Sequence, residues 1–453
     1  MKKKDYFEGI IEKVDFPNKG IVLTAEDERV HVSNVIEGQR VKGVVTKKRK
    51  GKMSGVILEL LEKSPDEIAP LCEVFGRCGG CLYQTLPYEK QLALKERQVT
   101  EMLDSLNTTY NYEGILKSPK LTAYRNKMEY SFGDSFKDGP LALGLHRRAS
   151  TYDIVDTTTC ILVDEDFNKI LKATLEFFQE EGLDYFSKKT HMGFLRHLII
   201  RKGEKTNELL INLVTTSQNN YSLKKWIDML NSLSLNNKIA GILHTINDEV
   251  ADAVKVTELR LLYGRDYFYD KLFDMSFKIS PFSFFQTNTL GAEVLYSKVR
   301  EYVGETKDKI VFDLYSGTGT ITQMLAPVAK KAVGVEIVEE AVNAAKENAT
   351  LNGLTNCEFI AGDVLKVLDE LTDKPDIIVL DPPRDGIHPK ALKKIIDFGV
   401  DQLVYVSCKP TSLVRDLEVL LQNGYKVEKV CCVDMYVNTA HVETVVLMSR
   451  KDK

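Results

Sequence analysis

The sequence predicts a multi-domain chain: a small N-terminal β-barrel, an α+β middle domain with a metal site, and a C-terminal α/β domain with a doubly wound parallel sheet. Three observations predict this order. Short β-rich runs separated by turns fill residues 5–62, three cysteines fall within ten residues after them, and strand-like and helix-like segments alternate from residue 310. We place the domains at 1–63, 64–275 and 276–453, since 453 residues suit about three domains.

The composition is that of an ordinary globular protein, with 43% hydrophobic and 28% charged residues. No apolar run approaches the roughly 18 residues that a membrane span needs. The first residues, MKKKDYFEG, lack the apolar segment of a signal peptide, so we expect a cytoplasmic protein with no membrane partner. The net charge is only −4, so a polyanionic partner would have to be bound by local basic patches.

The barrel is predicted from five runs in residues 5–62: YFEGIIEKV, GIVLTAE, RVHVSNV, QRVKGVVTKK and SGVILELLEK. One hairpin tip between two of these runs is strongly basic. This tip is either a solvated loop or a contact for phosphate groups, and its basic residues are Lys47, Lys48, Arg49, Lys50 and Lys52.

Closely spaced cysteines open the middle domain. Cys72, Cys78 and Cys81 follow the pattern C-x5-C-x2-C, and an amphipathic helix is predicted after them, from Tyr88 to Leu106. In a cytosolic chain such a group indicates metal binding rather than disulfides. With a distant fourth thiolate, the spacing fits a zinc site with four cysteine ligands or a [4Fe–4S] cluster equally well.

Basic residues interleaved with aromatic ones mark residues 121–275, a region of mixed strands and helices. This pattern suits a surface that grips phosphates and stacks bases, and the alternative is a solvated sheet face. The basic residues concerned are Arg125, Lys127, Arg147, Arg148, Arg196 and Arg201.

The C-terminal domain begins with a strand and a glycine turn in IVFDLYSGTGT, and its second strand ends at Glu336. An acid at that place can accept hydrogen bonds from ribose hydroxyls. The turn lacks the full dinucleotide fingerprint and the GK[ST] of a Walker A loop. A nicotinamide enzyme is one alternative, but it has no use for the later motifs DPPRDG and SCKP.

Cys408 follows a short apolar strand, Leu403 to Ser407, at the edge of the sheet where ligands bind in open α/β folds. Lys409 beside it is expected to favour the thiolate, which is the nucleophilic form of cysteine. A buried, inert strand-end cysteine is the alternative.

The combination DLYSGTGT, VGVEI, AGDV and LDPPR resembles the class I (Rossmann-like) S-adenosylmethionine-dependent methyltransferases. LDPPRDGIHP, VSCKPTSLVRDL and HVETVVLM more narrowly resemble the RNA (uracil-5-)-methyltransferases, over nearly the whole chain. The resemblance implies a TRAM domain for the OB-like barrel. It also implies a [4Fe–4S] cluster with Cys72, Cys78, Cys81 and Cys160 as ligands. Because the bacterial tRNA-specific branch typically lacks both features, the 23S rRNA branch is favoured.

Site residues carry over from this family by position. The resemblance makes Cys408 the nucleophile and Glu443 the general base, and it places the last strand, with Glu443, beside the strand that ends at Cys408. It gives a set of residues for S-adenosylmethionine: Gln286, Tyr315, Gly317, Gly319, Glu336, Asp363 and Asp381.

The expected function is therefore methylation of C5 of a specific uridine in 23S rRNA, by a monomer that binds no DNA. Two alternatives stay open. One is the same chemistry on tRNA. The other is an iron–sulfur, RNA-binding protein whose methyltransferase fold no longer catalyses, although Glu336, Asp381, Cys408 and Glu443 are all present.

Overall fold

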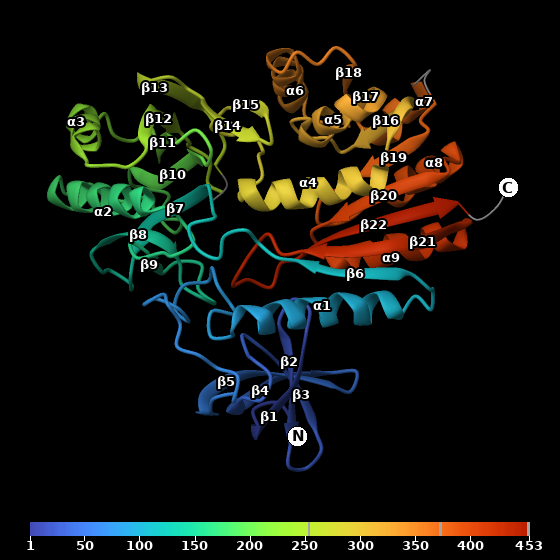
Figure 1. Ribbon diagram of the computed structural model, residues 1–453. Helices are drawn as coiled ribbons and strands as arrows, with labels where there is room; N and C mark the ends of the chain where they lie inside the picture. Colours follow the sequence, from blue (N-terminus) through green and yellow to red (C-terminus); the bar gives the residue numbers. More distant parts are fainter. Residues whose placement is uncertain (252–253, 371–373, 451–453) are drawn as a thin grey trace.

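The computed structural model describes residues 1–251, 254–370 and 374–450. The chain has three parts, a barrel, a seven-stranded sheet and an eight-stranded sheet, and helix α1 lies between the barrel and the large sheet (Figure 1). Within these ranges, none of the helices is long and apolar enough to cross a membrane.

The five strands expected in residues 5–62 are present and form a closed barrel in the order β1-β2-β3-β5-β4. Inward-facing valines and isoleucines alternate with exposed polar residues along β1 and β4, as a half-buried strand requires. The basic hairpin tip, residues 47–52, joins β4 to β5 and is exposed. The strands are β1 (Tyr6–Asp15), β2 (Lys19–Thr24), β3 (Arg29–Ser33), β4 (Arg40–Arg49) and β5 (Lys52–Glu62).

The middle region contains a seven-stranded sheet in the order β13-β12-β11-β10-β7-β8-β9, with two helices packed on it. Its central strand β10 is buried along its whole length. The elements are β7 (Lys127–Asp134), β8 (Leu141–His146), β9 (Ile154–Asp156), α2 (Glu165–Glu180), β10 (Leu195–Gly203), β11 (Glu208–Thr215), α3 (Lys224–Ser232), β12 (Lys238–Ile246) and β13 (Glu258–Gly264).

Two arginines predicted for a phosphate-binding surface are instead buried in this sheet. Arg196 donates to the backbone carbonyls of residues 247, 249 and 251, and Arg201 donates to the carbonyls of Ser280, Pro281 and Ser283. A buried guanidinium needs hydrogen-bond partners inside the protein, and both arginines find theirs among loop carbonyls, although the Nε–H of Arg201 has none. The prediction was wrong for these two residues, because alternation along a fully buried strand does not show which side chains reach solvent.

The C-terminal domain is an eight-stranded sheet in the order β18-β17-β16-β19-β20-β22-β21-β6, in which β22 runs antiparallel to its neighbours β20 and β21. The hairpin β14 (Phe268–Leu272) and β15 (Met275–Ile279) precedes it. Its strands are β6 (Asn111–Leu116), β16 (Thr306–Leu314), β17 (Ala329–Glu336), β18 (Cys357–Ala361), β19 (Ile377–Leu380), β20 (Gln402–Ser407), β21 (Tyr425–Val433) and β22 (Glu443–Arg450).

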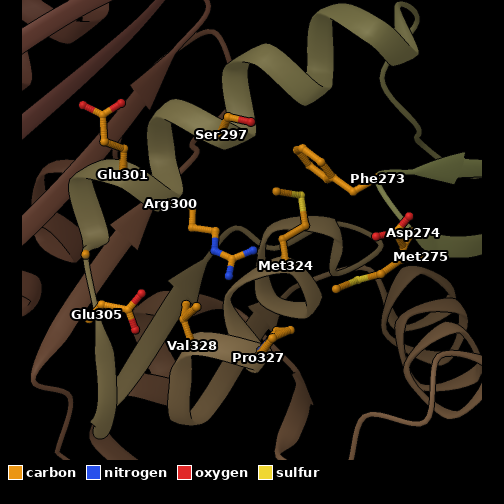
Figure 2. A pocket seen from close by; sticks show the side chains of 11 residues that line it. Phe273, Asp274, Met275, Ser297, Arg300, Glu301, Glu305, Met324, Pro327 and Val328 are labelled. Carbon is orange, nitrogen blue, oxygen red and sulfur yellow. The ribbon is translucent and has the colours of Figure 1, made fainter.

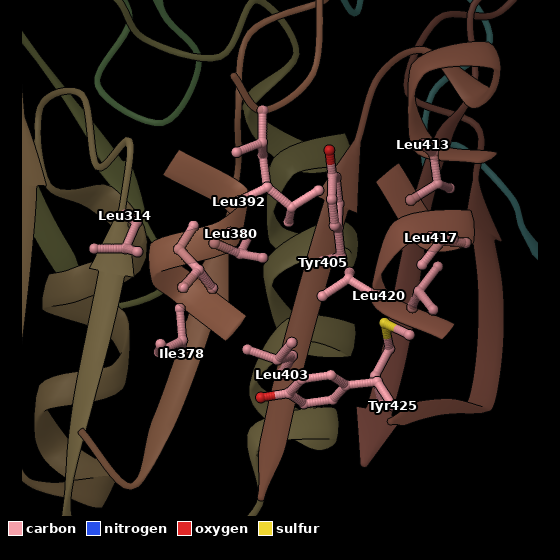
Figure 3. Close-up of a cluster of buried hydrophobic side chains, with 14 of the residues drawn as sticks. Leu314, Ile378, Leu380, Leu392, Leu403, Tyr405, Leu413, Leu417, Leu420 and Tyr425 are labelled. Carbon is pink, nitrogen blue, oxygen red and sulfur yellow. The ribbon is translucent and has the colours of Figure 1, made fainter. Parts of the chain in front are cut away.

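Helices cover both faces of this sheet. Figure 3 shows part of one core, where Leu380, Leu403 and Tyr405 of the strands meet Leu392, Leu413 and others of the helices. Burial of such side chains supplies the main favourable term in folding. The helices are α1 (Tyr88–Asp104), α4 (Thr289–Val303), α5 (Thr320–Leu325), η1 (Ala326–Val328), α6 (Glu339–Leu351), α7 (Val364–Glu370), α8 (Pro389–Phe398) and α9 (Pro410–Gln422).

Strand β6 lies in the range predicted for the middle domain, yet it pairs in parallel with β21 at the edge of the large sheet. Its pairing covers an edge that would otherwise expose unpaired backbone groups. A boundary placed at residue 276 therefore does not separate the strands of the two sheets.

Candidate active site

A cavity of about 1520 Å³ opens at the carboxyl ends of the parallel strands. This is the edge where open α/β sheets bind their ligands. Seven of the nine residues predicted for S-adenosylmethionine binding and catalysis line it: Gln286, Tyr315, Gly317, Glu336, Asp381, Cys408 and Glu443.

The glycine turn after β16 bends sharply toward the cavity. Tyr315 and Gly317 both have positive φ angles, 70° and 53°, and nothing but Phe284 lies near the space where a Gly317 side chain would stand. The Glu336 carboxylate accepts from the Gly317 N–H at 3.0 Å and from the Val338 N–H at 3.0 Å. These bonds hold Glu336 at the end of β17 and leave lone pairs for further hydrogen bonds.

Gly319 and Asp363, the other two predicted residues, have structural roles and do not line the cavity. A Cβ on Gly319 would stand 2.4 Å from the Phe359 ring, and its φ is 71°, so packing requires glycine there. The Asp363 carboxylate accepts from the Leu365 N–H at the start of α7, and its charge reaches Tyr315.

Cys408 and Glu443 lie at the ends of neighbouring strands. β22 runs antiparallel between β20 and β21, with Ser407 opposite Thr444, so Cys408 and Glu443 occupy the next pair of positions. Cys408 is half-buried and Glu443 is buried. The sequence placed the last strand beside that of Cys408, and this juxtaposition is confirmed.

Two carboxyl groups with raised pKa values line the cavity together. Burial, together with the charge of Asp381, raises the pKa of Glu443 to about 8, and the nearby Arg384 partly opposes this rise. Burial and the charge of Asp313 raise the pKa of Asp381 to about 7. Because burial penalises the charged form, near neutral pH each group is close to the point where it gains or loses a proton.

The Cys408 thiol is not a thiolate at rest. Burial, then the charges of Glu443 and Asp381, raise its pKa to about 11, while Arg384 lowers it by charge and hydrogen bonding. The prediction that Lys409 favours the thiolate was therefore wrong: the cation that acts on the sulfur is Arg384, which comes from the loop after β19. Burial and two carboxylates outweigh it.

Arg384, Tyr436 and His441 are among the cavity-lining residues that had no assigned role in the sequence. Arg384 belongs to the motif LDPPRDG, and its position directly after the two prolines could have identified it from the sequence. Tyr436 and His441 belong to the segment just before β22, and the HVET motif marks only its end. Burial lowers the pKa of His441 to about 4, so its imidazole is neutral at neutral pH.

The four predicted metal-ligand cysteines lie in one neighbourhood. Burial, then the charges of Cys160, Cys78 and Cys72, raise the pKa of Cys81 to about 12. The Gly80 N–H donates to the Cys78 sulfur at 3.3 Å. In the ranges that the structure describes, no three His, Cys, Asp or Glu side chains are arranged to hold a metal ion. Four cysteine thiolates are suitable metal ligands, but in this structure their sulfurs are not arranged to bind a metal ion.

The basic residues predicted to bind RNA occupy two places. Those of the hairpin tip, residues 47–50, are exposed on the barrel. The others lie near the cysteines and β7: Arg148 donates to the Cys81 carbonyl and lies over the Phe75 ring, Arg125 donates to the Lys127 carbonyl, and Arg147 pairs with Asp153.

A second cavity, of about 550 Å³, lies at the opposite end of β16 (Figure 2). Its walls come from the end of α4, the β14–β15 turn and the α5–η1 segment, and Arg300 points into it among Met324, Val328 and Glu305. It contains none of the residues predicted for catalysis or binding.

The fold is that of an S-adenosylmethionine-dependent methyltransferase, and comparisons with known proteins identify the family. A model of the tRNA (uracil-5-)-methyltransferase family matches residues 87–451, so the chain belongs to that family. It is 49% identical to an uncharacterized RNA methyltransferase of Clostridium tetani, over 100% of this chain and 99% of that one. An uncharacterized RNA methyltransferase of Caldanaerobacter subterraneus is 48% identical, over 97% of this chain and 98% of that one.

One solved structure is similar over the whole chain. The Pyrococcus abyssi tRNA (uracil-54, C5)-methyltransferase in complex with S-adenosyl-L-homocysteine is 27% identical, with a TM-score of 0.76, and the match covers 98% of this chain and 99% of that one. Together these relatives make the chain an RNA (uracil-C5)-methyltransferase that uses S-adenosylmethionine.

Glu443→Gln is expected to stabilise the protein increasingly as the pH rises. The folded-state pKa of Glu443, about 8, lies above its ordinary value of 4.5, so its contribution to stability is present below pH 4.5 and is lost as the pH rises through 8. Glutamine stays neutral throughout. The gain in Tm over the unmodified protein should grow between about pH 4.5 and about pH 8 in thermal unfolding and then level off. The exposed Glu59→Gln is the control, and an equal pH trend in both variants would contradict the prediction.

Proposed function

We propose that this enzyme methylates C5 of a specific uridine in 23S rRNA through a covalent bond between Cys408 and uracil C6. The observation that supports this proposal best is the placement of Cys408 and Glu443 at adjacent positions of β20 and β22, in the cavity that also receives the glycine turn.

The chemistry needs a nucleophile because C5 of uracil is too weak a nucleophile to take a methyl group unaided. Attack of the Cys408 thiolate forms an S–C6 bond and moves the C5–C6 π electrons into an enolate, which makes C5 electron-rich. C5 then takes the methyl group from the sulfonium, and S-adenosylhomocysteine leaves. Glu443 removes the C5 proton, the C6–S bond breaks, and the thiolate is restored.

The charges in the cavity fit this sequence of steps. Arg384 favours the thiolate of Cys408, and a protonated Glu443 or a positive sulfonium nearby would favour it further. Glu443 must then be ionised when the C5 proton leaves, and a pKa of about 8 suits a base that works near neutral pH. We assign S-adenosylmethionine binding to Gln286, Tyr315, Gly317, Glu336 and Asp381.

A uridine in structured RNA has to leave its stack to reach such a cavity, as it does in other enzymes that act on bases. The barrel and the four cysteines favour rRNA as the substrate. The second candidate is tRNA, because the similar Pyrococcus abyssi enzyme, a tRNA (uracil-54, C5)-methyltransferase, matches this chain over nearly its full length.

Mapping of 5-methyluridine in total RNA, with and without the gene, tests the substrate. We expect one uridine of 23S rRNA to lose its methyl group in the deletion strain while every tRNA keeps its own. Loss of a tRNA methyl group with intact rRNA would replace the first candidate by the second.

Substitutions of Cys408 and Glu443 are expected to stop the reaction at different steps. Cys408→Ala should bind RNA but form neither product nor adduct. Glu443→Gln should attack and methylate and then stall, leaving RNA covalently bound to the protein. The unmodified enzyme should stall in the same way on 5-fluorouridine RNA, because fluorine cannot leave as a proton does.

A gel shift that survives denaturation reports these adducts. If Cys408→Ala still traps 5-fluorouridine RNA, the nucleophile is another residue. If Glu443→Gln turns over normally, the base lies elsewhere, and Asp381 becomes the candidate.

The barrel tip is proposed to contact RNA phosphates through Lys47, Lys48, Arg49 and Lys50, which are exposed. Neutralising all four should weaken RNA binding and flatten the dependence of log K on log salt by about 0.7–0.9 per lost phosphate contact, because fewer counterions are released. Binding measured across a salt series checks this. An unchanged slope would make the tip a solvated loop without RNA contacts.

Cys72, Cys78, Cys81 and Cys160 are proposed to hold a [4Fe–4S] cluster that organises the fold around them. The convergence of four thiols and the Gly80 N–H donor to sulfur support this assignment. Anaerobically purified protein should be brown and contain about four irons per chain. Cys81→Ser should lose iron and harm folding or RNA binding more than S-adenosylmethionine binding. Stoichiometric zinc without iron would refute the cluster.

A further inference from the structure

The segment between β21 and β22, residues 434–442, contains Tyr436 and His441, which line the catalytic cavity. It ends directly before Glu443, the first residue of β22. We call it the 434–442 loop. It contains no helix or strand, so its backbone groups have to find partners elsewhere. Where those partners come from decides what holds the catalytic cavity in shape.

Many of the partners come from the N-terminal third of the chain. The carbonyl of Asn438 accepts from two consecutive N–H groups, Leu82 at 2.7 Å and Tyr83 at 3.0 Å. The carbonyl of Val437 accepts from the Tyr124 hydroxyl at 2.9 Å. The Met435 carbonyl, by contrast, is held from the C-terminal domain, by the amide of Asn288 in front of α4.

Helix α1 supplies the side chains. Lys95, fully buried, donates to the Asp434 carboxylate at 2.7 Å and to the Tyr436 carbonyl at 3.1 Å. Gln91 pairs with Asn438 twice: its amide donates to the Asn438 side-chain oxygen at 3.0 Å, and its oxygen accepts from the Asn438 N–H at 2.9 Å. Asn438 has a φ of 67°, so the turn at this point is tight.

We propose that Gln91 and Lys95 of α1, with the backbone N–H groups of Leu82 and Tyr83, are positioning residues of the methyltransferase site. They do not line the catalytic cavity, but they fix the loop from which Tyr436, His441 and Glu443 enter it. Ala440, at the far end of the loop, packs into the same buried cluster as Tyr83 and the barrel. This inference rests on the proposed role of Glu443 as the base.

The step that depends most on the 434–442 loop is removal of the C5 proton. Cys408 follows β20 and does not lie on the loop, so attack on C6 should survive loosening of the loop. Misplacement of a base by about 1 Å can cost about 100-fold in rate. A loosened loop should therefore slow proton removal more than adduct formation.

Gln91→Leu is the test variant, and α1 itself offers its control. Gln98, on the same helix and also buried, donates to the Val14 carbonyl of the barrel at 2.8 Å and lies outside the set of side chains that bond to the 434–442 loop. Gln98→Leu therefore removes a buried glutamine and its bond to the barrel from the same helix, whereas Gln91→Leu removes two bonds to the 434–442 loop and one to the Leu86 carbonyl. Lys95 is a poor choice for the test, because its removal would leave Asp434 buried without its cation.

RNA carrying tritium at uracil C5 measures proton removal, and 5-fluorouridine RNA measures adduct formation. In Gln91→Leu we expect tritium release to fall by about 10-fold to 100-fold, with normal trapping of 5-fluorouridine RNA and an accumulated adduct on ordinary RNA. Gln98→Leu should show none of these effects at an equal loss of Tm. Asn438→Gly keeps the tight turn, the carbonyl and the N–H that donates to Gln91, but it loses the side-chain oxygen that accepts from Gln91, so it should change tritium release in the same direction as Gln91→Leu and by less.

Identical kinetics in Gln91→Leu and Gln98→Leu would overturn the inference, since both would then act only on stability. The proposed function fails in a different way. If Glu443→Gln releases tritium normally, Glu443 is not the base. If Glu443→Gln stalls while Gln91→Leu and Asn438→Gly do not, only the positioning role is refuted.

Discussion

Ser407 and Thr444 face each other where β22 inserts, antiparallel, between β20 and β21. This one strand order brings the residue after β20 and the first residue of β22 to the same edge of the sheet. Without the insertion, Cys408 and Glu443 would be separated by the helix and strand that lie between them in the chain. The glycine turn of β16 reaches the same edge because parallel strands all end there.

Burial sets the chemistry of the cavity as much as the choice of residues does. Two carboxyl groups and a thiol share a partly dry space with one exposed arginine, so each negative charge makes the next ionisation harder. A site that kept Cys408 ionised at rest would hold an oxidisable sulfur. Here burial and the two carboxyl groups favour the neutral thiol of Cys408 over the thiolate.

The sequence predicted the strands of the barrel and the parallel sheet because their apolar periods and turns are local signals. It predicted Cys408, Glu443 and Glu336 because each ends or begins a strand in a recognisable motif. It missed Arg384 and Tyr436, which reach the cavity from loops, and it misplaced Arg196 and Arg201, whose burial depends on distant loop carbonyls. The pairing of β6 with β21 joins segments that are far apart in the chain, and no local pattern marks it.

Several contacts between distant parts of the chain join its N-terminal third to the C-terminal domain. β6, α1 and the residues just after Cys81 all lie before the middle sheet in the chain, yet each packs against the C-terminal domain at β21 or at the segment that follows it. The catalytic edge therefore takes its shape partly from residues 82–124. A methyltransferase domain cut at residue 276 would lose the cavity walls that residues 254–267 supply, and it would also lose the partners of Asp434 and Asn438. Residues of the N-terminal third thus support the loop that carries two walls of the cavity.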